Sequence, residues 1–369
     1  MDATPLLLTR TGVGEFCLRS MQALAERPDI DVSAFALTWR GWRDLAGLVP
    51  RGVKVAGRPV PARALRAAWS HSSLPPSEAL IGRFDVVHGT NYVAPPSRSA
   101  ATVATVYDLT VLHLPEMCEP ASLAFPHLVR RAVRAGAWVH TPSQFVAEEV
   151  VSLLGVPPER VRTVALGVTA PGTGGTAVSS ATSLPGWVGS YVLALGTVEP
   201  RKGLPGLVRA FSRIASDHPA TALVLAGPDG WGTAELAAAL AGSPARDQVL
   251  RLGWVSDDQR DALLAGAAAL AYPSLYEGFG LPPLQAMAAG TPVVATRAGA
   301  LEEVLGDAAL LVEVGDEDAL AQALEAVLSD VALGRGLAER GRRHAARYSW
   351  EACGDGLAQL YRDAAAGTP

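Results

Sequence analysis

The chain has 369 residues, 49% of them hydrophobic and 18% charged, with a formal net charge of −5. This composition excludes an intrinsically disordered protein, and the length indicates two domains instead of one. The longest apolar stretches, such as residues 262–272 and 285–295, are too short to span a bilayer.

The expected compartment follows from the cysteines and from the first residues. Cys17, Cys118 and Cys353 are isolated and have neither metal-binding nor disulfide spacing. The N-terminus lacks the charged and apolar regions of a signal peptide. Both observations favour a reduced, cytoplasmic compartment.

Short β-type runs alternate with helical patterns over residues 1–168. Such alternation is typical of parallel sheets that helices cover on both faces. We therefore expect residues 1–168 to form one doubly wound, Rossmann-like domain. The strand-like runs are residues 32–37, 86–88, 101–107, 138–141 and 161–164.

A short glycine loop with Gly12 and Gly14 opens a helical pattern that runs toward Leu24. In a parallel fold such a loop follows the first, central strand, but residues 2–6 resemble only the end of a strand. We therefore expect the native reading frame to begin several residues upstream of Met1 and to supply a β-branched strand.

Residues 169–188 are rich in Gly, Ser, Thr and Pro and carry no charge, which is typical of an interdomain linker. The strand–helix alternation then recurs over residues 189–347, which we predict to be a second Rossmann-like domain. Residues 348–369 carry one further helical pattern.

Adjacent cations, Arg201 and Lys202, lie between a short apolar run and a helical pattern. Lys202 is one of only two lysines among 31 basic residues, the other being Lys54. An ammonium suits a phosphate as a point charge, and a guanidinium can contact two phosphate oxygens. The pair indicates a phosphate-binding corner, with a solvated pair of charges at a helix start as the alternative.

The most informative segment, residues 272–296, combines an acid, a Gly-Phe-Gly loop and a helix start. The loop follows Glu277, and the helix is expected to open at Pro282 and Pro283, where missing amide protons cost least. Free amides and the helix dipole favour an anion there. Gln285 lies eight positions after Glu277. The pattern indicates a nucleotide-sugar pocket, and a strand-to-helix corner without a ligand is the alternative.

This segment resembles the E-x7-E motif of the family-4 retaining glycosyltransferases, including mannosyltransferases, which have the GT-B fold. The resemblance covers nearly the whole chain. It implies two doubly wound α/β domains facing each other across a cleft, with residues 348–369 packing back on the N-terminal domain as a helix. It also implies that Glu277 contacts the transferred sugar, and that Gln285 stands where the family has a ribose-binding acid.

The resemblance assigns the remaining site residues as well. Arg201 and Lys202 are expected at the donor diphosphate, and the loop of Gly12 and Gly14 is expected to close over it. Trp254 lies beside the nucleobase by this likeness, although an aromatic after a short strand is more often core. The other expected donor-binding residues are Gly196, Gly253, Val255, Gly278, Phe279, Gly280 and Leu281.

On the acceptor side, Tyr107 stands where the family commonly has a histidine. A tyrosine can hydrogen-bond to a sugar but accepts protons poorly near neutral pH. Asp108 is expected to orient the acceptor. His88 and His113 are further candidates on the acceptor side, and ordinary packing histidines are the alternative for both.

The charge is unevenly shared between the halves. Residues 1–170 carry 17 Lys and Arg against 14 Asp and Glu, a net of +3, and the rest carry 14 against 22, a net of −8. The basic half is compatible with weak peripheral contact to the inner face of a membrane, although solvated faces explain so small a charge better. The sequence has no basic stripe with interleaved aromatics, so we expect no nucleic-acid partner.

The resemblance implies a retaining hexosyltransferase that moves a sugar from a nucleoside diphosphate to a glycan, lipid-linked or small-molecule acceptor. No metal or cofactor is expected. GDP-mannose is the favoured donor, with UDP-sugars close behind, and the likeness is greatest to enzymes of polysaccharide or lipid-linked glycan synthesis. One alternative is a non-catalytic nucleotide-sugar-binding module, which the neutral Tyr107 and Gln285 would favour. Another is a different GT-B sugar-nucleotide enzyme, such as an epimerase.

Overall fold

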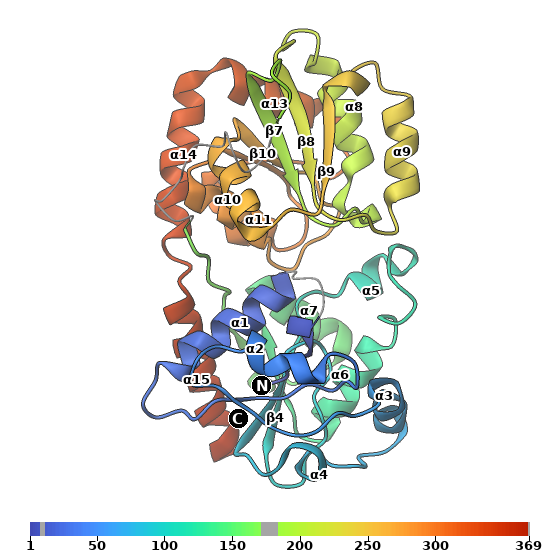
Figure 1. The fold of residues 1–369 in the computed structure, drawn as a ribbon, viewed down its shortest axis with the longest axis vertical. Coiled ribbons are helices and arrows are strands. Elements are labelled where there is room, and N and C mark those ends of the chain that lie inside the picture. Colours follow the sequence, from blue (N-terminus) through green and yellow to red (C-terminus); the bar gives the residue numbers. More distant parts are fainter. Residues whose placement is uncertain (8–11, 171–183, 368–369) are drawn as a thin grey trace. The chain divides into compact units, whose positions relative to one another are not determined.

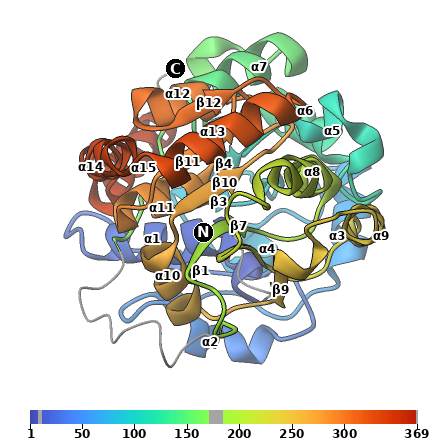
Figure 2. The ribbon, with the colours of Figure 1, turned by 90° about the horizontal axis from the view of Figure 1, so that it is seen from above.

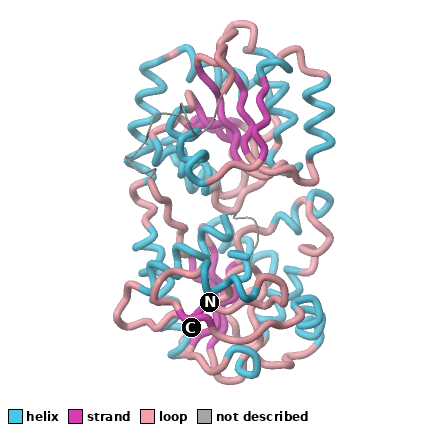
Figure 3. The backbone as a smooth tube through the Cα atoms, viewed as in Figure 1, coloured by secondary structure: helices cyan, strands magenta, loops and turns pink. Residues whose placement is uncertain are grey.

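The computed structural model describes residues 1–7, 12–170 and 184–367. The chain forms two compact units, one of Met1–Gly167 with Tyr348–Pro369 and one of Val168–Arg347. Each unit has parallel strands at its centre with helices around them (Figures 1 and 3). Arg10 and Thr11 of the glycine loop, and residues 171–183 of the linker expected at 169–188, lie outside the described residues.

The N-terminal unit contains a four-stranded parallel sheet of order β3-β4-β5-β6 and a separate parallel pair, β1-β2. Asp2 lies between these two pieces, because it bridges to Phe35 and its amide N donates to the carbonyl O of His88 at 2.8 Å. The strands are β1 (Ser33–Ala34), β2 (Lys54–Val55), β3 (Val86–Gly89), β4 (Ala101–Thr105), β5 (Trp138–Thr141) and β6 (Val161–Thr163).

The last helix of the chain belongs to the N-terminal unit. It begins after Ser349, whose Oγ accepts from the amide N of Ala352 at 3.0 Å. It packs against the first helix and against β3 and β4, so the expected return of the C-terminal helix to the N-terminal domain is confirmed. The helices of this unit are α1 (Gly12–Ala25), α2 (Leu45–Leu48), α3 (Ala62–His71), α4 (Glu78–Ile81), α5 (Thr110–His113), α6 (Phe125–Arg134), α7 (Gln144–Leu154) and α15 (Trp350–Ala366).

A buried chain of hydrogen bonds joins α15 to the sheet. His140 Nε2 lies 2.9 Å from the carbonyl O of Val164 and therefore donates to it, which leaves Nδ1 to accept from Thr105 Oγ1 at 2.9 Å. Thr105 then accepts from His88 Nε2 at 2.7 Å, and His88 Nδ1 accepts from the hydroxyl of Tyr361 at 2.6 Å. In this arrangement both imidazoles are neutral and every bond in the chain forms.

We expect this chain to make the N-terminal unit sensitive to acid. Burial lowers the pKa of His140 from 6.5 to about 4. Because the unfolded chain then binds a proton that the folded one does not, stability falls as the pH drops below 6.5, by about 2 kcal/mol at pH 5. Thermal unfolding at pH 7 and pH 5 measures the loss. His140→Phe should reduce the difference in Tm, whereas the exposed His127→Phe should leave it unchanged.

The C-terminal unit is built on a six-stranded parallel sheet of order β12-β11-β10-β7-β8-β9. All six residues of β8 are buried, as expected for a sheet that helices cover on both faces. The strands are β7 (Ser190–Leu195), β8 (Thr221–Ala226), β9 (Val249–Gly253), β10 (Ala269–Tyr272), β11 (Val293–Thr296) and β12 (Leu310–Val312).

Two helices, α8 and α13, lie side by side along this sheet (Figure 2). Leu207 and Phe211 of α8 and Leu324 of α13 are fully buried in the core between helix and strand layers. The helices of this unit are α8 (Leu204–Ile214), α9 (Thr233–Ala241), α10 (Asp257–Gly266), α11 (Leu281–Ala289), α12 (Leu301–Leu305), α13 (Glu317–Ser329) and α14 (Val331–Ala345).

The strand order reverses between β7 and β10. From this pair, β8 and β9 continue in one direction and β11 and β12 in the other. In such sheets the loops that leave the two central strands diverge at their carboxyl ends and form a crevice for ligands. The expected doubly wound α/β architecture is thus confirmed. None of the described helices combines the length and hydropathy needed to cross a membrane.

Candidate active site

The candidate site lies at the carboxyl ends of β7 and β10, where the strand order reverses. The loop after β7 forms a short 3-10 helix, Pro200–Lys202, before α8 begins at Leu204. The loop after β10 carries Glu277 and leads into α11. The amide N of Leu275 donates to the carbonyl O of Arg201 at 2.7 Å and so joins the two loops.

Gly203 allows this close approach. Its φ is +64°, and a Cβ there would lie 2.2 Å from the carbonyl O of Pro273. A side chain would therefore be strained by the backbone conformation and would also clash with the neighbouring loop. The sequence places glycine where the cationic loop must contact the acidic one.

The substitution Gly203→Ala is expected to destabilise the C-terminal unit and to loosen the site. A side chain at this φ value lowers the free energy of unfolding by about 1–2 kcal/mol, and the clash lowers it further. Gly315→Ala is the matched control, because Gly315 has a φ of +82° but no atom within 4 Å of its Cβ position. A larger fall in Tm for Gly203→Ala than for Gly315→Ala would show the effect of the clash, and equal falls would contradict it.

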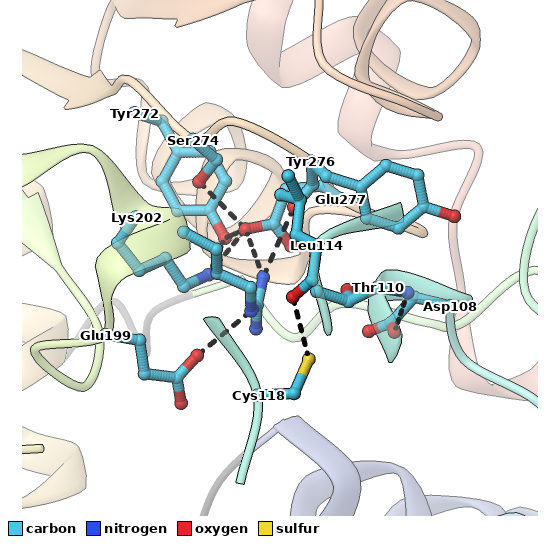
Figure 4. Close-up of polar contacts among 11 residues, drawn as sticks. Asp108, Thr110, Leu114, Cys118, Glu199, Lys202, Tyr272, Ser274, Tyr276 and Glu277 are labelled. Atoms are coloured by element: carbon cyan, nitrogen blue, oxygen red, sulfur yellow. Dashed lines mark hydrogen bonds and ion pairs between the residues drawn. The ribbon is translucent and has the colours of Figure 1, made fainter. Parts of the chain in front are cut away.

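Glu277 is the centre of a buried polar cluster, which Figure 4 shows in close-up. Its side chain is 9% exposed, and its Oε1 accepts hydrogen bonds from side chains of both loops. The donors are Lys202 Nζ at 2.6 Å, Ser274 Oγ at 2.8 Å, Arg201 Nη1 at 2.9 Å and the hydroxyl of Tyr272 at 3.0 Å.

The cations determine the charge of this carboxyl group. Burial by itself raises the pKa of Glu277, but Arg201 and then Lys202 overcome this effect and lower the pKa to about 2. Arg201 also pairs with Glu199, Nε to Oε2, at 3.0 Å. Burial raises the pKa of Tyr272 well above 10, so its hydroxyl stays a donor to Glu277. The carboxylate is therefore ionised at neutral pH.

The loop after Glu277 leads directly into a helix N-terminus. Gly278, Phe279 and Gly280 are buried, and α11 starts at Leu281, one residue before the expected Pro282. Pro282 and Pro283 have no N–H, so Leu281 supplies the amide of the first turn that is suited to an anion. Gln285 lies one turn further along α11 and is partly buried. The acid, the glycine loop and the helix start thus follow one another as expected.

A cavity adjoins this cluster at the ends of β7, β8, β9 and β10. Lys202, Tyr272 and Pro273 line it, together with the strand-end glycines Gly196, Gly227 and Gly253. Trp254, which follows β9, is 60% exposed, so the interpretation of this side chain as core is wrong. Val255 is partly buried beside it.

Three residues of the site were not found from the sequence. Tyr272 and Ser274 bind Glu277, and Arg251 lines the cavity and forms an ion pair with Asp229. A signal for two of them was present: Tyr272 ends an apolar strand and Ser274 follows two positions later. Arg251 lies within a strand, where nothing in the sequence distinguished it.

The acceptor-side candidates lie in the N-terminal unit. Tyr107 is partly buried and donates its hydroxyl to the carbonyl O of Thr90 at 2.7 Å. Asp108 Oδ1 accepts from the amide N of Thr110 at 3.0 Å. His113 Nε2 lies 2.6 Å from Glu149 Oε1, and its side chain is 39% exposed.

His88 requires a correction. It is 1% exposed, and both of its ring nitrogens are used in the chain that joins Tyr361 to Thr105. It therefore cannot reach an acceptor in this structure and acts as a packing histidine. Gly12 and Gly14 form the first turn of α1, so this segment opens a helix as expected.

Metal ligands do not gather in the part of the chain that the structure describes: no group of three or more His, Cys, Asp or Glu side chains is placed to hold an ion.

Two family models match the chain. The model "Glycosyl transferases group 1" matches residues 189–344, and "Glycosyltransferase Family 4" matches residues 10–170. O-antigen chain mannosyltransferase B of Escherichia coli is 32% identical over 285 residues, which cover 73% of this chain and 71% of that protein. The MMP alpha-(1->4)-mannosyltransferase of Mycolicibacterium hassiacum is 32% identical over 247 residues, 66% of this chain and 58% of that protein.

Solved structures agree on the fold. The sucrose-phosphate synthase of Thermosynechococcus elongatus superposes with a TM-score of 0.74 at 22% sequence identity, over 96% of this chain and 93% of that one. Each of the two units is Rossmann-like. The chain also matches both family models, and it matches a relative along most of that relative's length. The chain belongs to the family-4 glycosyltransferases and has the GT-B fold.

Proposed function

We propose that this glycosyltransferase retains the anomeric configuration and binds a nucleoside-diphosphate sugar in its C-terminal unit. The observation that carries the proposal is the convergence of Arg201 and Lys202 on one oxygen of Glu277. Two cations beside the N-terminus of α11 can neutralise a diphosphate. The carboxylate between them can accept hydrogen bonds from sugar hydroxyls.

The ion pairs of the site suggest how a donor would bind. Glu199 and Glu277 offset the charges of Arg201 and Lys202. We infer that the diphosphate takes over hydrogen bonds of the two cations, which frees the carboxylate of Glu277 for the sugar. Tyr272 and Ser274 then hold this carboxylate in position through its Oε1.

In the proposed reaction, the bond between the anomeric carbon and the β-phosphate oxygen breaks. The acceptor hydroxyl oxygen bonds to the anomeric carbon from the leaving-group side, and its proton passes to the departing diphosphate. Negative charge grows on the phosphate oxygen, so Arg201, Lys202 and the amides of Gly280 and Leu281 stabilise the transition state more than the ground state. The atoms balance without a metal or cofactor, and we propose that neither is required.

We propose GDP-mannose as the donor and a glycan or lipid-linked molecule as the acceptor. Support for mannose comes from the two relatives that are named mannosyltransferases. UDP-sugars are the main alternative. Asp108 is the residue proposed to orient the acceptor, with exposed His113 as a further candidate. Weak peripheral contact of the N-terminal unit with a membrane, and a cytoplasmic location, also remain proposals.

A non-catalytic nucleotide-sugar-binding module is the second candidate. Tyr107 favours the binding module. Its hydroxyl donates to the carbonyl O of Thr90, and burial raises the pKa of Tyr107 well above 10. Such a group does not accept a proton near neutral pH. The relatives that match the chain are named as transferases, which supports the catalytic function.

Thermal unfolding with GDP-mannose and UDP-glucose, followed by a nucleotide-release assay with and without EDTA, tests the proposal. A true donor at about 100 times its Kd should stabilise the protein by about 2.7 kcal/mol. Release of GDP that EDTA does not slow would support a metal-independent transferase. Binding without any turnover would favour the binding module, and no effect of either nucleotide sugar would overturn the assignment of the site.

A further inference from the structure

Tyr272 lies between a cation and an anion of the candidate site. It is the last residue of β10 and is 3% exposed. Its hydroxyl accepts a hydrogen bond from Lys202 Nζ at 2.6 Å and donates one to Glu277 Oε1 at 3.0 Å. Figure 4 shows Tyr272, Lys202 and Glu277 together. One neutral, buried side chain therefore contacts both the ammonium and the carboxylate.

The ring of Tyr272 contacts the same ammonium. Nζ of Lys202 lies 4.7 Å from the centroid of the ring, which is within the range of a cation–π interaction. A lysine side chain is flexible, and its charge alone has no preferred direction. The ring and the hydroxyl of Tyr272 supply that direction, because they contact the ammonium at two different places.

The hydrogen bonds of Lys202 leave one N–H for a ligand. An ammonium has three N–H donors, and Tyr272 and Glu277 accept two of them. Among the described residues, Nζ has no further hydrogen-bond partner. Since the bonds of the nitrogen are tetrahedral, fixing two N–H directions also fixes the third. Lys202 and Tyr272 line the same cavity, where a bound phosphate can accept from the third N–H.

A bound donor would change these contacts unequally. A diphosphate is an anion and competes with the carboxylate of Glu277 for the ammonium. Glu277 would still be held by Ser274 and Tyr272. Lys202 would keep only Tyr272 of its two hydrogen-bond partners. The hydroxyl carries no charge that a phosphate replaces, and it can accept from Lys202 while it donates to Glu277.

We propose that Tyr272 is a positioning residue that keeps the ammonium of Lys202 directed at the diphosphate when the donor draws it away from Glu277. This inference rests on the proposed function, because it needs a diphosphate at Lys202. Tyr272 acts on kcat through Lys202, without touching the substrate. Negative charge on the diphosphate grows in the transition state, where a misplaced hydrogen-bond donor lowers the rate most.

The substitution Tyr272→Phe tests this role, because phenylalanine keeps the ring and removes only the hydroxyl. Tyr191→Phe is the matched control, since Tyr191 is also buried in the C-terminal unit but donates to the carbonyl O of Leu263, at 2.8 Å. With GDP-mannose as donor, we expect Tyr272→Phe to lower kcat by about 10-fold and to change the Kd of GDP by less than about twofold. Tyr191→Phe should change neither. Both variants lose one buried hydrogen bond, so a general loss of stability would affect them alike.

A second substitution shows whether Tyr272 acts through Lys202. Tyr272→Phe added to a chain that already carries Lys202→Met should lower kcat by less than about twofold, because the group that it positions is absent. A further loss of about 10-fold would contradict the proposal. So would a loss of GDP affinity as large as the loss of kcat, because the hydroxyl would then act on binding instead of on the transition state.

The ammonium itself gives a readout that needs no nucleotide sugar. Lys202 and Lys54 are the only lysines, so NMR of a chain labelled at its lysine side-chain nitrogens shows at most two ammonium signals, and Lys54→Met identifies them. Two buried acceptors slow the hydrogen exchange of Lys202, so we expect its signal in the unchanged protein and in Tyr191→Phe, and its loss in Tyr272→Phe. An unchanged signal in Tyr272→Phe would overturn the proposal.

The two measurements separate this inference from the proposed function. If the unchanged protein released no nucleotide from GDP-mannose or UDP-glucose, the proposed function would fail. The ammonium signal would still decide whether Tyr272 positions Lys202.

Discussion

Replacing Lys202 by methionine is expected to lower kcat by about 100-fold, the scale set by losing one donor to a transition-state charge. The ammonium lies 2.6 Å from Glu277 Oε1, and its side chain is 12% exposed, so solvent screens it little. Methionine keeps the apolar stem but removes the charge. Because negative charge on the leaving diphosphate is greatest in the transition state, kcat should fall more than donor affinity.

The chain offers a direct control for this substitution, because it has only one other lysine. Lys54 lies on β2 in the N-terminal unit, is 74% exposed and pairs with Asp31 at 3.5 Å. Exposed pairs of this kind contribute little, so Lys54→Met should change kcat less than twofold. Steady-state release of GDP from GDP-mannose compares the two variants, with circular dichroism to verify folding. Similar kcat values for both would contradict the role given to Lys202.

Much of the fold was predictable because its signals are local. The apolar run at residues 138–141 coincides with β5 (Trp138–Thr141), and the alternation of strands and helices predicted the parallel sheets. Shorter strands were harder to predict. The run at residues 32–37 contains only β1 (Ser33–Ala34), and β2 (Lys54–Val55) was missed because it has only two residues and lies in a basic segment.

The site was predictable where its residues are neighbours in the sequence. Arg201 and Lys202 stood out as a pair of cations, and Glu277 stood out beside a glycine loop and a helix start. That all three meet at one oxygen depends on the neighbouring positions of β7 and β10, which strand order decides and sequence does not show. The same limit explains His88, whose partner Tyr361 is 273 residues away.

Replacing Glu277 by glutamine is expected to separate catalysis from nucleotide binding. Glutamine has nearly the same shape and can keep its carbonyl oxygen where four donors now converge, but it is neutral. The sugar would lose its charged acceptor, so kcat should fall by about 100-fold. Arg201 and Lys202 would no longer be held by a carboxylate, so GDP should bind as tightly as in the unchanged protein or up to tenfold more tightly.

Titration calorimetry with GDP and steady-state kinetics with GDP-mannose measure the two effects separately. Glu339→Gln is the control, since Glu339 lies on α14, is 71% exposed and pairs only with another exposed side chain, Arg343, at 3.2 Å. Glu339→Gln should alter neither the affinity for GDP nor kcat. A tenfold loss of GDP affinity in Glu277→Gln would mean that the carboxylate mainly positions the two cations for the diphosphate. In that case the proposed direct contact between Glu277 and the sugar would be wrong. The variant would lose activity because the two cations bind the diphosphate less tightly, and the sugar need not be part of the effect.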